Sequence, residues 1–207
     1  MTALLQSTTE VSAEILAELA IEEGRVTEAV RSGGNLTIRG LIEEEAWSLL
    51  DSAGRRSTRT AAEILIVTTT SRPDLLDQAF ALRHRVFLEE VGRDRTVETD
   101  EYDETAQHVV GVLAGRVIGT LRLYTLTPGD RDIKIGRVAV DRNLRGRGIG
   151  RDLMWVAGEW ATAQGFVSAY LHAEATAIDF YKTLGYRAEG EQFMESGKPH
   201  LAMRLNF

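Results

Sequence analysis

The sequence predicts a mixed α/β fold that follows a small helical module. Two observations lead to this prediction. Apolar residues recur at helical spacing up to about residue 50, and β-branched or alternating runs separate the helical runs from residue 63 onward. From that point the expected order of elements is β-α-β-β-β-α-β-α-β-β, so that helices and strands belong to one domain.

Residues 1–60 are expected to form the helical module and a linker. One apolar stripe runs through residues 11–20 and a second through 38–50, and the Gly33–Gly34 pair interrupts the chain between them. Residues 51–60 are small and polar, which is typical of a linker, so a domain boundary is expected near residue 60. The first 62 residues carry ten acidic and six basic side chains, which argues against DNA binding by this module. No residue in it indicates another role.

The second domain is expected over residues 61–207. Pro73 suits the first position of a helix, and Ala114-Gly115 suits the turn of a hairpin. The expected elements are a strand at 64–70, a helix from 73 to 90, hairpin strands at 109–113 and 117–126, a strand at 134–140, a helix at 148–163, a strand at 167–173, a short helix at 175–184, and strands at 185–193 and 201–207.

Composition excludes several classes of function. The formal net charge of −7 disfavours nonspecific binding to nucleic acid, which requires a basic surface. The absence of cysteine removes disulfides, thiolate metal sites and thiol nucleophiles. No apolar run is long enough to cross a membrane, and the first residues lack the pattern of a signal peptide. We therefore expect a cytoplasmic protein that binds neither nucleic acid nor membranes.

A glycine-rich run carries the first functional signal. Arg145-Gly146-Arg147-Gly148-Ile149-Gly150 lies between an apolar strand and an amphipathic helix. Glycines at such a junction let backbone N–H groups approach a bound anion at the helix N-terminus. The preceding strand follows a hairpin and does not open a βαβ unit, so a dinucleotide-binding fold fits poorly. The pattern predicts a ligand that carries a pyrophosphate.

Two motifs in this order resemble the GNAT (general N-acetyltransferase) superfamily. Arg145, Gly148 and Gly150 match its pyrophosphate-binding segment, and Phe180 to Tyr186 looks like its F-Y-x-x-L-G-F/Y helix. The resemblance covers residues 63 to 207. It implies a mixed, mostly antiparallel sheet with a splayed central strand pair and flanking helices, and it implies acetyl-CoA as the acyl donor. Within the superfamily, motifs around Arg83 and the segment from Glu195 to His200 look ElaA-like.

The resemblance also implies roles for individual residues. Tyr181 matches the general acid that protonates the departing thiolate, and it could instead be an aromatic packed on a neighbouring helix. Backbone groups of Val138, Ala139 and Val140 are expected to hold the pantetheine arm. The cofactor-binding residues expected besides these are Arg145, Gly146, Arg147, Gly148, Ile149 and Gly150.

The sequence leaves several candidates for the general base and for the residues that bind the acceptor amine. Besides the acid Tyr181, the reaction needs a general base, and the residues expected to supply it are His172, His200 and Glu195. Further candidates for the base are His108, Glu98, Asp103 and Glu174. Any single histidine in this position is often structural. The residues expected to bind the acceptor amine are Arg83, Phe87, Glu98, Asp100, Asp103 and His108. The acidic stretch to which three of them belong could attract an amine or could be a solvated loop. We expect no metal.

The expected reaction is transfer of an acetyl group from acetyl-CoA to a primary amine of a small molecule or peptide. Two alternatives remain. Acyl-homoserine lactone synthases generally lack a clean R-x-x-G-x-G run, but this sequence also resembles their spacing at Arg83, Phe87, Glu98, Asp100, Asp103 and Arg122. A non-catalytic acyl-CoA sensor would bind the donor without releasing thiol. Many relatives dimerise, so a homodimer is a further expectation.

Overall fold

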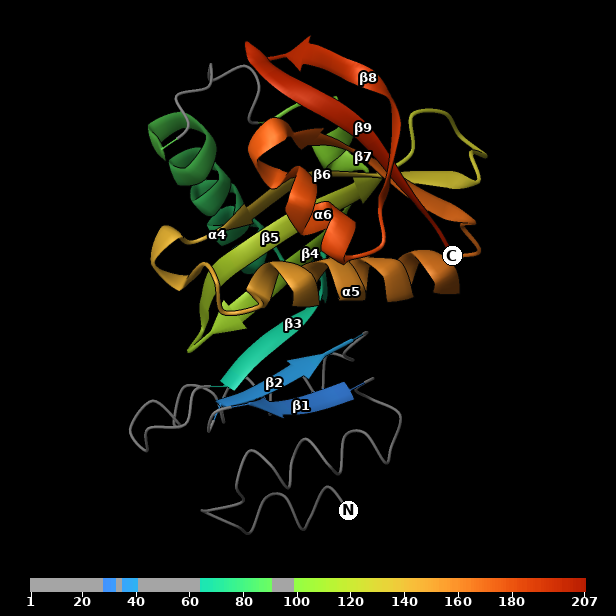
Figure 1. Ribbon diagram of the computed structural model, residues 1–207. Coiled ribbons are helices and arrows are strands. Elements are labelled where there is room, and N and C mark those ends of the chain that lie inside the picture. The colour runs from blue at the N-terminus through green and yellow to red at the C-terminus, as the bar shows by residue number, and fades with distance from the viewer. Residues whose placement is uncertain (1–27, 33–34, 41–63, 91–98) are drawn as a thin grey trace, which may run out of the picture.

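The computed structural model describes residues 28–32, 35–40, 64–90 and 99–207 and is built on one sheet (Figure 1). Within these ranges the sheet has nine strands in the order β1-β2-β3-β4-β5-β6-β7-β9-β8. The strands are β1 (Glu28–Ser32), β2 (Asn35–Arg39), β3 (Ile64–Thr70), β4 (Gln107–Leu113), β5 (Arg116–Tyr124), β6 (Asp132–Val140), β7 (Ser168–Glu174), β8 (Arg187–Glu195) and β9 (Lys198–Asn206). Among these described strands the pairs β2/β3 and β6/β7 are parallel and the other six are antiparallel, which confirms the predicted mixed and mostly antiparallel fold.

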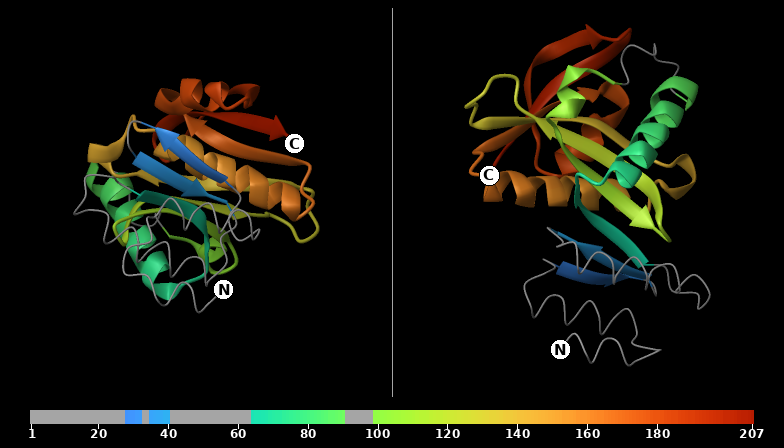
Figure 2. Two further views of the ribbon diagram at one scale, coloured as in Figure 1. Left: turned by 90° about the horizontal axis from the view of Figure 1, so that it is seen from below. Right: turned by 180° about the vertical axis from the view of Figure 1, so that it is seen from behind.

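Helices cover both faces of the sheet (Figure 2). The main helices are α4 (Pro73–His84), α5 (Ile149–Ala163) and α6 (Ile178–Thr183), and short helical turns are η1 (Arg85–Glu90), η3 (Glu101–Glu104), η4 (Arg142–Leu144) and η5 (Ala175–Ala177). On one face α4 continues into the π-helical turn η1, and on the other α5 lies across the sheet with α6 beside it. None of the helices in the described ranges is long and apolar enough to span a membrane.

The apolar stripe of α5 forms the centre of the core. Leu153, Val156 and Ala157 are fully buried against β-strand side chains such as Ile118 and Leu121. Residues at this spacing share one face of a helix, so the helical periodicity of the sequence directly predicts the buried face. This packing holds the N-terminus of α5 next to the end of β6, where the glycine-rich run lies.

The prediction of a helical module is wrong for residues 28–39. These residues form β1 and β2, and β2 pairs in parallel with β3, so the strands extend the sheet of the second region. The two strands pair antiparallel with Ser32 opposite Asn35. In a sequence, a glycine pair between two short runs favours a hairpin, and the helical interpretation overlooked this signal. The other parts of the predicted module, the linker and the boundary near residue 60 lie outside the described residues.

The two central strands β6 and β7 separate soon after they meet. They pair in parallel only from Asp132↔Ser168 to Lys134↔Tyr170. Beyond this point β6 contains a bulge, in which Arg137 and Val138 lie opposite Leu121 of β5 and Arg137 adopts a left-handed backbone conformation (φ 55°). A bulge bends a strand and increases its twist. From Ile135 onward, the edge of β6 that faces β7 therefore has no strand partner within the described part of the chain.

A pair of glycines tests how tightly α5 packs on the sheet. Gly111 and Gly119 are partners on β4 and β5, and a Cβ on Gly119 would lie 2.9 Å from Ile149 Cγ2, whereas one on Gly111 would lie 3.6 Å from the same atom. We expect Gly119→Ala to lower the free energy of unfolding by about 1–3 kcal/mol through overpacking. Gly111→Ala, the matched control, should be neutral or stabilising by up to about 1 kcal/mol. Urea unfolding of both variants checks this, and equal effects would contradict it.

Candidate functional site

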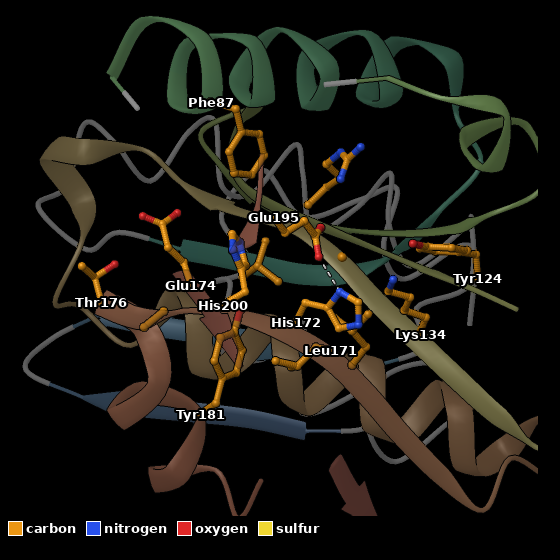
Figure 3. Close-up of a pocket in the computed structure, with 15 residues that line it drawn as sticks. Phe87, Tyr124, Lys134, Leu171, His172, Glu174, Thr176, Tyr181, Glu195 and His200 are labelled. Carbon is orange, nitrogen blue, oxygen red and sulfur yellow. Dashed lines mark hydrogen bonds and ion pairs between the residues drawn. The ribbon is translucent and has the colours of Figure 1, made fainter. Parts of the chain in front are cut away.

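Two adjoining pockets open where β6 and β7 diverge. The large pocket, of about 630 Å³, lies over the end of β6 and the start of α5. The small pocket, of about 190 Å³, lies between β6, β7 and the β8–β9 hairpin (Figure 3). Both pockets are lined by Phe87, Val138, Glu174, Thr176, Ala177 and Tyr181. These shared residues mark the junction at which two ligands would meet.

The glycine-rich run forms the floor of the large pocket. Gly146 and Gly148 have positive φ angles of 78° and 87°, which glycine adopts without strain. Helix α5 begins at Ile149, and no side chain caps its first turn. Its leading N–H groups and the positive end of its dipole are therefore suited to an anion. A Cβ on Gly150 would lie 3.2 Å from the Phe180 ring, so α6 packs closely over this turn.

Arg145 braces the turn that precedes the helix. Its Nε donates a hydrogen bond to the Val140 carbonyl over 3.0 Å, and its guanidinium pairs with Glu90 of η1 at 2.8 Å. Asp141 caps η4 by accepting from the Asn143 N–H. Of the residues predicted to hold the donor, Arg147 does not line the large pocket and all the others do.

Tyr181 lies at the junction of the two pockets. It comes from α6, its side chain is 8% exposed, and in Figure 3 its hydroxyl points toward the small pocket. Burial raises the pKa of its phenol. The group therefore keeps its proton at neutral pH, and a phenol in this state can donate a proton to a departing anion.

A histidine–glutamate pair lines the opposite side of the small pocket. His172 Nδ1 lies 2.5 Å from Glu195 Oε2, so the imidazole donates its Nδ1 proton and Nε2 becomes the basic nitrogen (Figure 3). Burial favours the neutral form of Glu195, but the hydrogen bond from His172 and nearby positive charges hold its pKa below the ordinary value. The two-residue turn Ser196-Gly197, with positive φ at both positions, brings Glu195 to this place.

His200 and Glu174 complete this wall. They are cross-strand partners on β9 and β7, and His200 is 3% exposed. His200 Nδ1 hydrogen-bonds the Lys198 carbonyl over 3.0 Å, while Lys198 Nζ pairs with Glu174 at 3.3 Å. The Phe193 ring stacks against His200 and lies edge-on to His172. The structure thus brings together His172, Glu195 and His200, which the sequence analysis had grouped with Tyr181.

Several residues that line the small pocket were not among the candidates predicted from the sequence. Among them are Tyr124, Lys134 and Arg137. Lys134 carried a signal of its own, because a lysine in a strand whose residues are mostly apolar is unusual in a buried sheet.

Three of the six residues predicted to bind the acceptor, namely Arg83, Asp100 and Asp103, lie behind the pocket in an ion-pair network. Arg83 binds Asp103 through two hydrogen bonds of 2.7 and 3.0 Å, and Arg122 binds both Asp100 and Asp103 at 2.6 to 2.7 Å. Arg137 Nη2 reaches Asp100 at 2.9 Å. The network therefore anchors the β6 bulge. Neither Arg83 nor the two aspartates line either of these two pockets.

The other predicted acceptor residues lie in three different places. Phe87 lines both pockets. His108 is buried, and its Nε2 lies 3.1 Å from the Asp103 carbonyl oxygen; burial lowers its pKa, which favours a neutral ring. Glu98 lies outside the described residues.

Comparison with known proteins places these motifs in a family. The sequence model of the acetyltransferase (GNAT) family matches residues 76–186. The uncharacterized N-acetyltransferase YjcF of Bacillus subtilis is 34% identical over 130 residues, which cover 62% of this chain and 90% of that protein. Crystal structures of an acyl-CoA N-acyltransferase from Pseudomonas aeruginosa and of Escherichia coli ElaA each superpose with a TM-score of 0.61, at 28% and 26% identity, over 68% of this chain and 98% of theirs.

A structure of the acyl-homoserine lactone synthase BjaI is more distant. It superposes with a TM-score of 0.55 at 23% identity over 64% of this chain and 76% of its own. This likeness shows a shared fold alone, so it does not favour that alternative over an ordinary acyltransferase.

The ion-pair network makes stability sensitive to acid. Burial alone would raise the pKa of Asp103, but the hydrogen bonds and charges of Arg83 and Arg122 lower it from 3.8 to about 2. Because the folded-state pKa is depressed, the stabilisation is complete above about pH 4 and is lost as the pH falls through about 2. We expect this carboxylate to contribute roughly 2 kcal/mol to that loss. Urea unfolding from pH 5 to 2 should show a shallower decline for Asp103→Asn, and an unchanged slope would contradict this assignment.

Proposed function

Because the chain belongs to the acetyltransferase (GNAT) family, we propose that it transfers an acetyl group from acetyl-CoA to the primary amine of a small molecule or peptide. The observation that carries this proposal is the junction of the two pockets at Tyr181 and Val138. A donor in the large pocket and an amine in the small pocket would meet there. Binding both reactants in one orientation removes much of the entropic barrier to their reaction.

The large pocket fits the donor on its own chemistry. The uncapped start of α5 and the open backbone of Gly146 and Gly148 suit a pyrophosphate. The unpaired edge of β6 beyond Ile135 leaves backbone groups that can hydrogen-bond the amides of a pantetheine arm, as an added strand would. The same groups near Val138 would polarise the thioester carbonyl.

The proposed reaction is a direct displacement. The neutral amine attacks the thioester carbon, a C–N bond forms, and the C–S bond breaks as the tetrahedral intermediate collapses. Tyr181 gives its phenolic proton to the departing sulfur, and the amine loses a proton to His172 Nε2, directly or through a water molecule. The products are an amide and free CoA thiol, and both side chains return to their starting state by proton exchange with solvent.

His172 is the preferred base because Glu195 orients it. A carboxylate at Nδ1 fixes the tautomer that leaves Nε2 basic, and it stabilises the imidazolium that forms on proton uptake. His200 is the second candidate, and its ring is held by the Lys198 carbonyl, which offers less stabilisation to a positive ring than a carboxylate does.

The activity itself is tested by thiol release from acetyl-CoA. A panel of amino acids, polyamines, aminoglycosides, peptide N-termini and S-adenosylmethionine should contain at least one acceptor that releases thiol and yields the acetylated amine. Homoserine lactone formation from S-adenosylmethionine would instead identify a lactone synthase. Tight CoA binding without thiol release from any amine would identify a sensor.

Donor binding at the glycine run has a matched test. Gly148 and Gly129 have nearly the same positive φ, 87° and 89°, and a Cβ at either would meet nothing within 4 Å. Alanine at either position should cost about 1–2 kcal/mol of stability through backbone strain. Only Gly148→Ala places a methyl group in the large pocket, so it alone should raise the Kd of CoA, by about tenfold or 1.4 kcal/mol. Isothermal titration with CoA checks this, and similar affinities for both variants would count against the assigned pocket.

Tyr181→Phe tests the acid. We expect kcat to fall about 100-fold while CoA affinity is retained, because only the proton donor is lost. Tyr186→Phe is the control, since its ring lies 5.9 Å from that of Tyr181, is equally buried and lines neither pocket. Steady-state rates at saturating substrates decide this. Equal rates for the two variants would remove the acid role from Tyr181.

His172→Ala tests the base. We expect about a 100-fold loss of kcat, and a smaller loss for Glu195→Gln, which keeps a hydrogen-bond acceptor but removes the charge. His84→Ala, at an exposed position on α4, should leave the rate unchanged. If His172→Ala were active and His200→Ala inactive with an intact fold, the base would be His200.

A further inference from the structure

Lys134 occupies the point at which the two central strands separate. It is the last residue of β6 that pairs with β7, opposite Tyr170, and it also pairs with Tyr124 of β5. Its ammonium group lies 6.0 Å from the ring centroids of both tyrosines, and its side chain lines the small pocket. In Figure 3 it lies beside His172 on the side of the pocket away from Thr176 and Glu174.

The charge of Lys134 is not neutralised within the described part of the chain. Its Nζ makes no hydrogen bond or ion pair there, and its polar contacts are the faces of Tyr124 and Tyr170. Glu195 is the carboxylate that favours its charged form most, but that carboxylate is bound to His172. Burial lowers the pKa of Lys134, so the protein bears a cost for placing a cation there.

A second cation faces the same pocket. Arg137 lines it and is paired with Asp100 at 2.9 Å. That aspartate also binds Arg122, so the described network joins three guanidinium groups, those of Arg83, Arg122 and Arg137, to two carboxylates. Lys134 and Arg137 therefore place two cationic side chains in the lining of the small pocket, whereas Glu174 lies opposite His200 and Glu195 is bound to His172.

We propose that the acceptor is a small amine that also carries an anionic group, either a carboxylate or a phosphate, which Lys134 and Arg137 bind at the base of the strand separation. The amine then lies toward His172 and Tyr181, at the junction of the pockets. A pocket of about 190 Å³ suits a molecule of amino-acid size. This inference rests on the proposed function and specifies the acceptor of the same site.

The test uses acceptors that differ only in the anion. Thiol release is measured for amino acids against their amides and their decarboxylated amines, and for ethanolamine phosphate against ethanolamine. We expect kcat/KM of the best anionic acceptor to exceed that of its neutral counterpart at least 30-fold. The carboxylate and phosphate series together show which anion is used.

Variants of Lys134 assign the effect to this residue. Lys134→Met fills the same space without charge and should lower kcat/KM for the anionic acceptor at least tenfold, chiefly through KM, with no loss for the neutral counterpart. Lys134→Arg keeps the positive charge and should retain part of the preference for the anionic over the neutral acceptor. Lys182→Met, at an exposed lysine outside both pockets, is the control and should match wild type. Circular dichroism and CoA affinity confirm that each variant is folded.

Several outcomes overturn the inference. One is an equal kcat/KM of the wild-type protein for the anionic acceptor and its neutral counterpart. Another is an equal loss of kcat/KM for both acceptors in Lys134→Met, since that result indicates that Lys134 acts in catalysis or folding. If no amine releases thiol, the proposed function fails. The inference is then tested by calorimetric titration of the CoA-bound protein with amino acids and their amides, where absent binding or equal affinity for both would overturn it.

Discussion

The separation of β6 from β7 is the constraint on which the rest of this site depends. The two parallel strands pair over three residues, and the bulge at Arg137 and Val138 then bends β6 away. Buried backbone groups need hydrogen-bond partners, so an opened sheet edge is costly unless a ligand or solvent satisfies it. Here the open edge leads from Lys134 to the start of α5. The large pocket, the small pocket and Tyr181 all lie along it.

The buried ion pairs give this bulge a single position. Arg137 has a left-handed backbone conformation, which costs a non-glycine residue about 1 kcal/mol or more. Its guanidinium is bound to Asp100, and Asp100 and Asp103 are bound in turn by Arg122 and Arg83. These contacts join α4, η3, β5 and β6. Buried ion pairs often add little net stability, but their geometry is specific, so they can hold a strained backbone in one conformation beside the two pockets.

Much of the fold and part of the site could be predicted from the sequence. The helices and strands after residue 63 lie close to where the apolar periodicity of the sequence predicted them. The glycine-rich run lies at the start of a helix, as its spacing predicted, and it lines the large pocket. The hairpin at residues 28–39 was missed because short strands and short amphipathic helices have similar apolar patterns. Arg83, Asp100 and Asp103 were predicted to bind the acceptor, but the structure places them in the ion-pair network behind the small pocket, where Arg83 binds Asp103 and Arg122 binds both aspartates.

Lys134 marks the limit of sequence reasoning for this protein. The sequence by itself determined the strands and helices after residue 63 and the glycine-rich turn before α5, because these depend on local spacing and on backbone conformations that only glycine adopts easily. Only the tertiary structure decided that His172 meets Glu195 and that Lys134 lies at the base of the strand separation without a carboxylate partner in the described residues. Those contacts join residues far apart in the chain, and they are set by strand register and by where β6 and β7 separate, which no local pattern encodes.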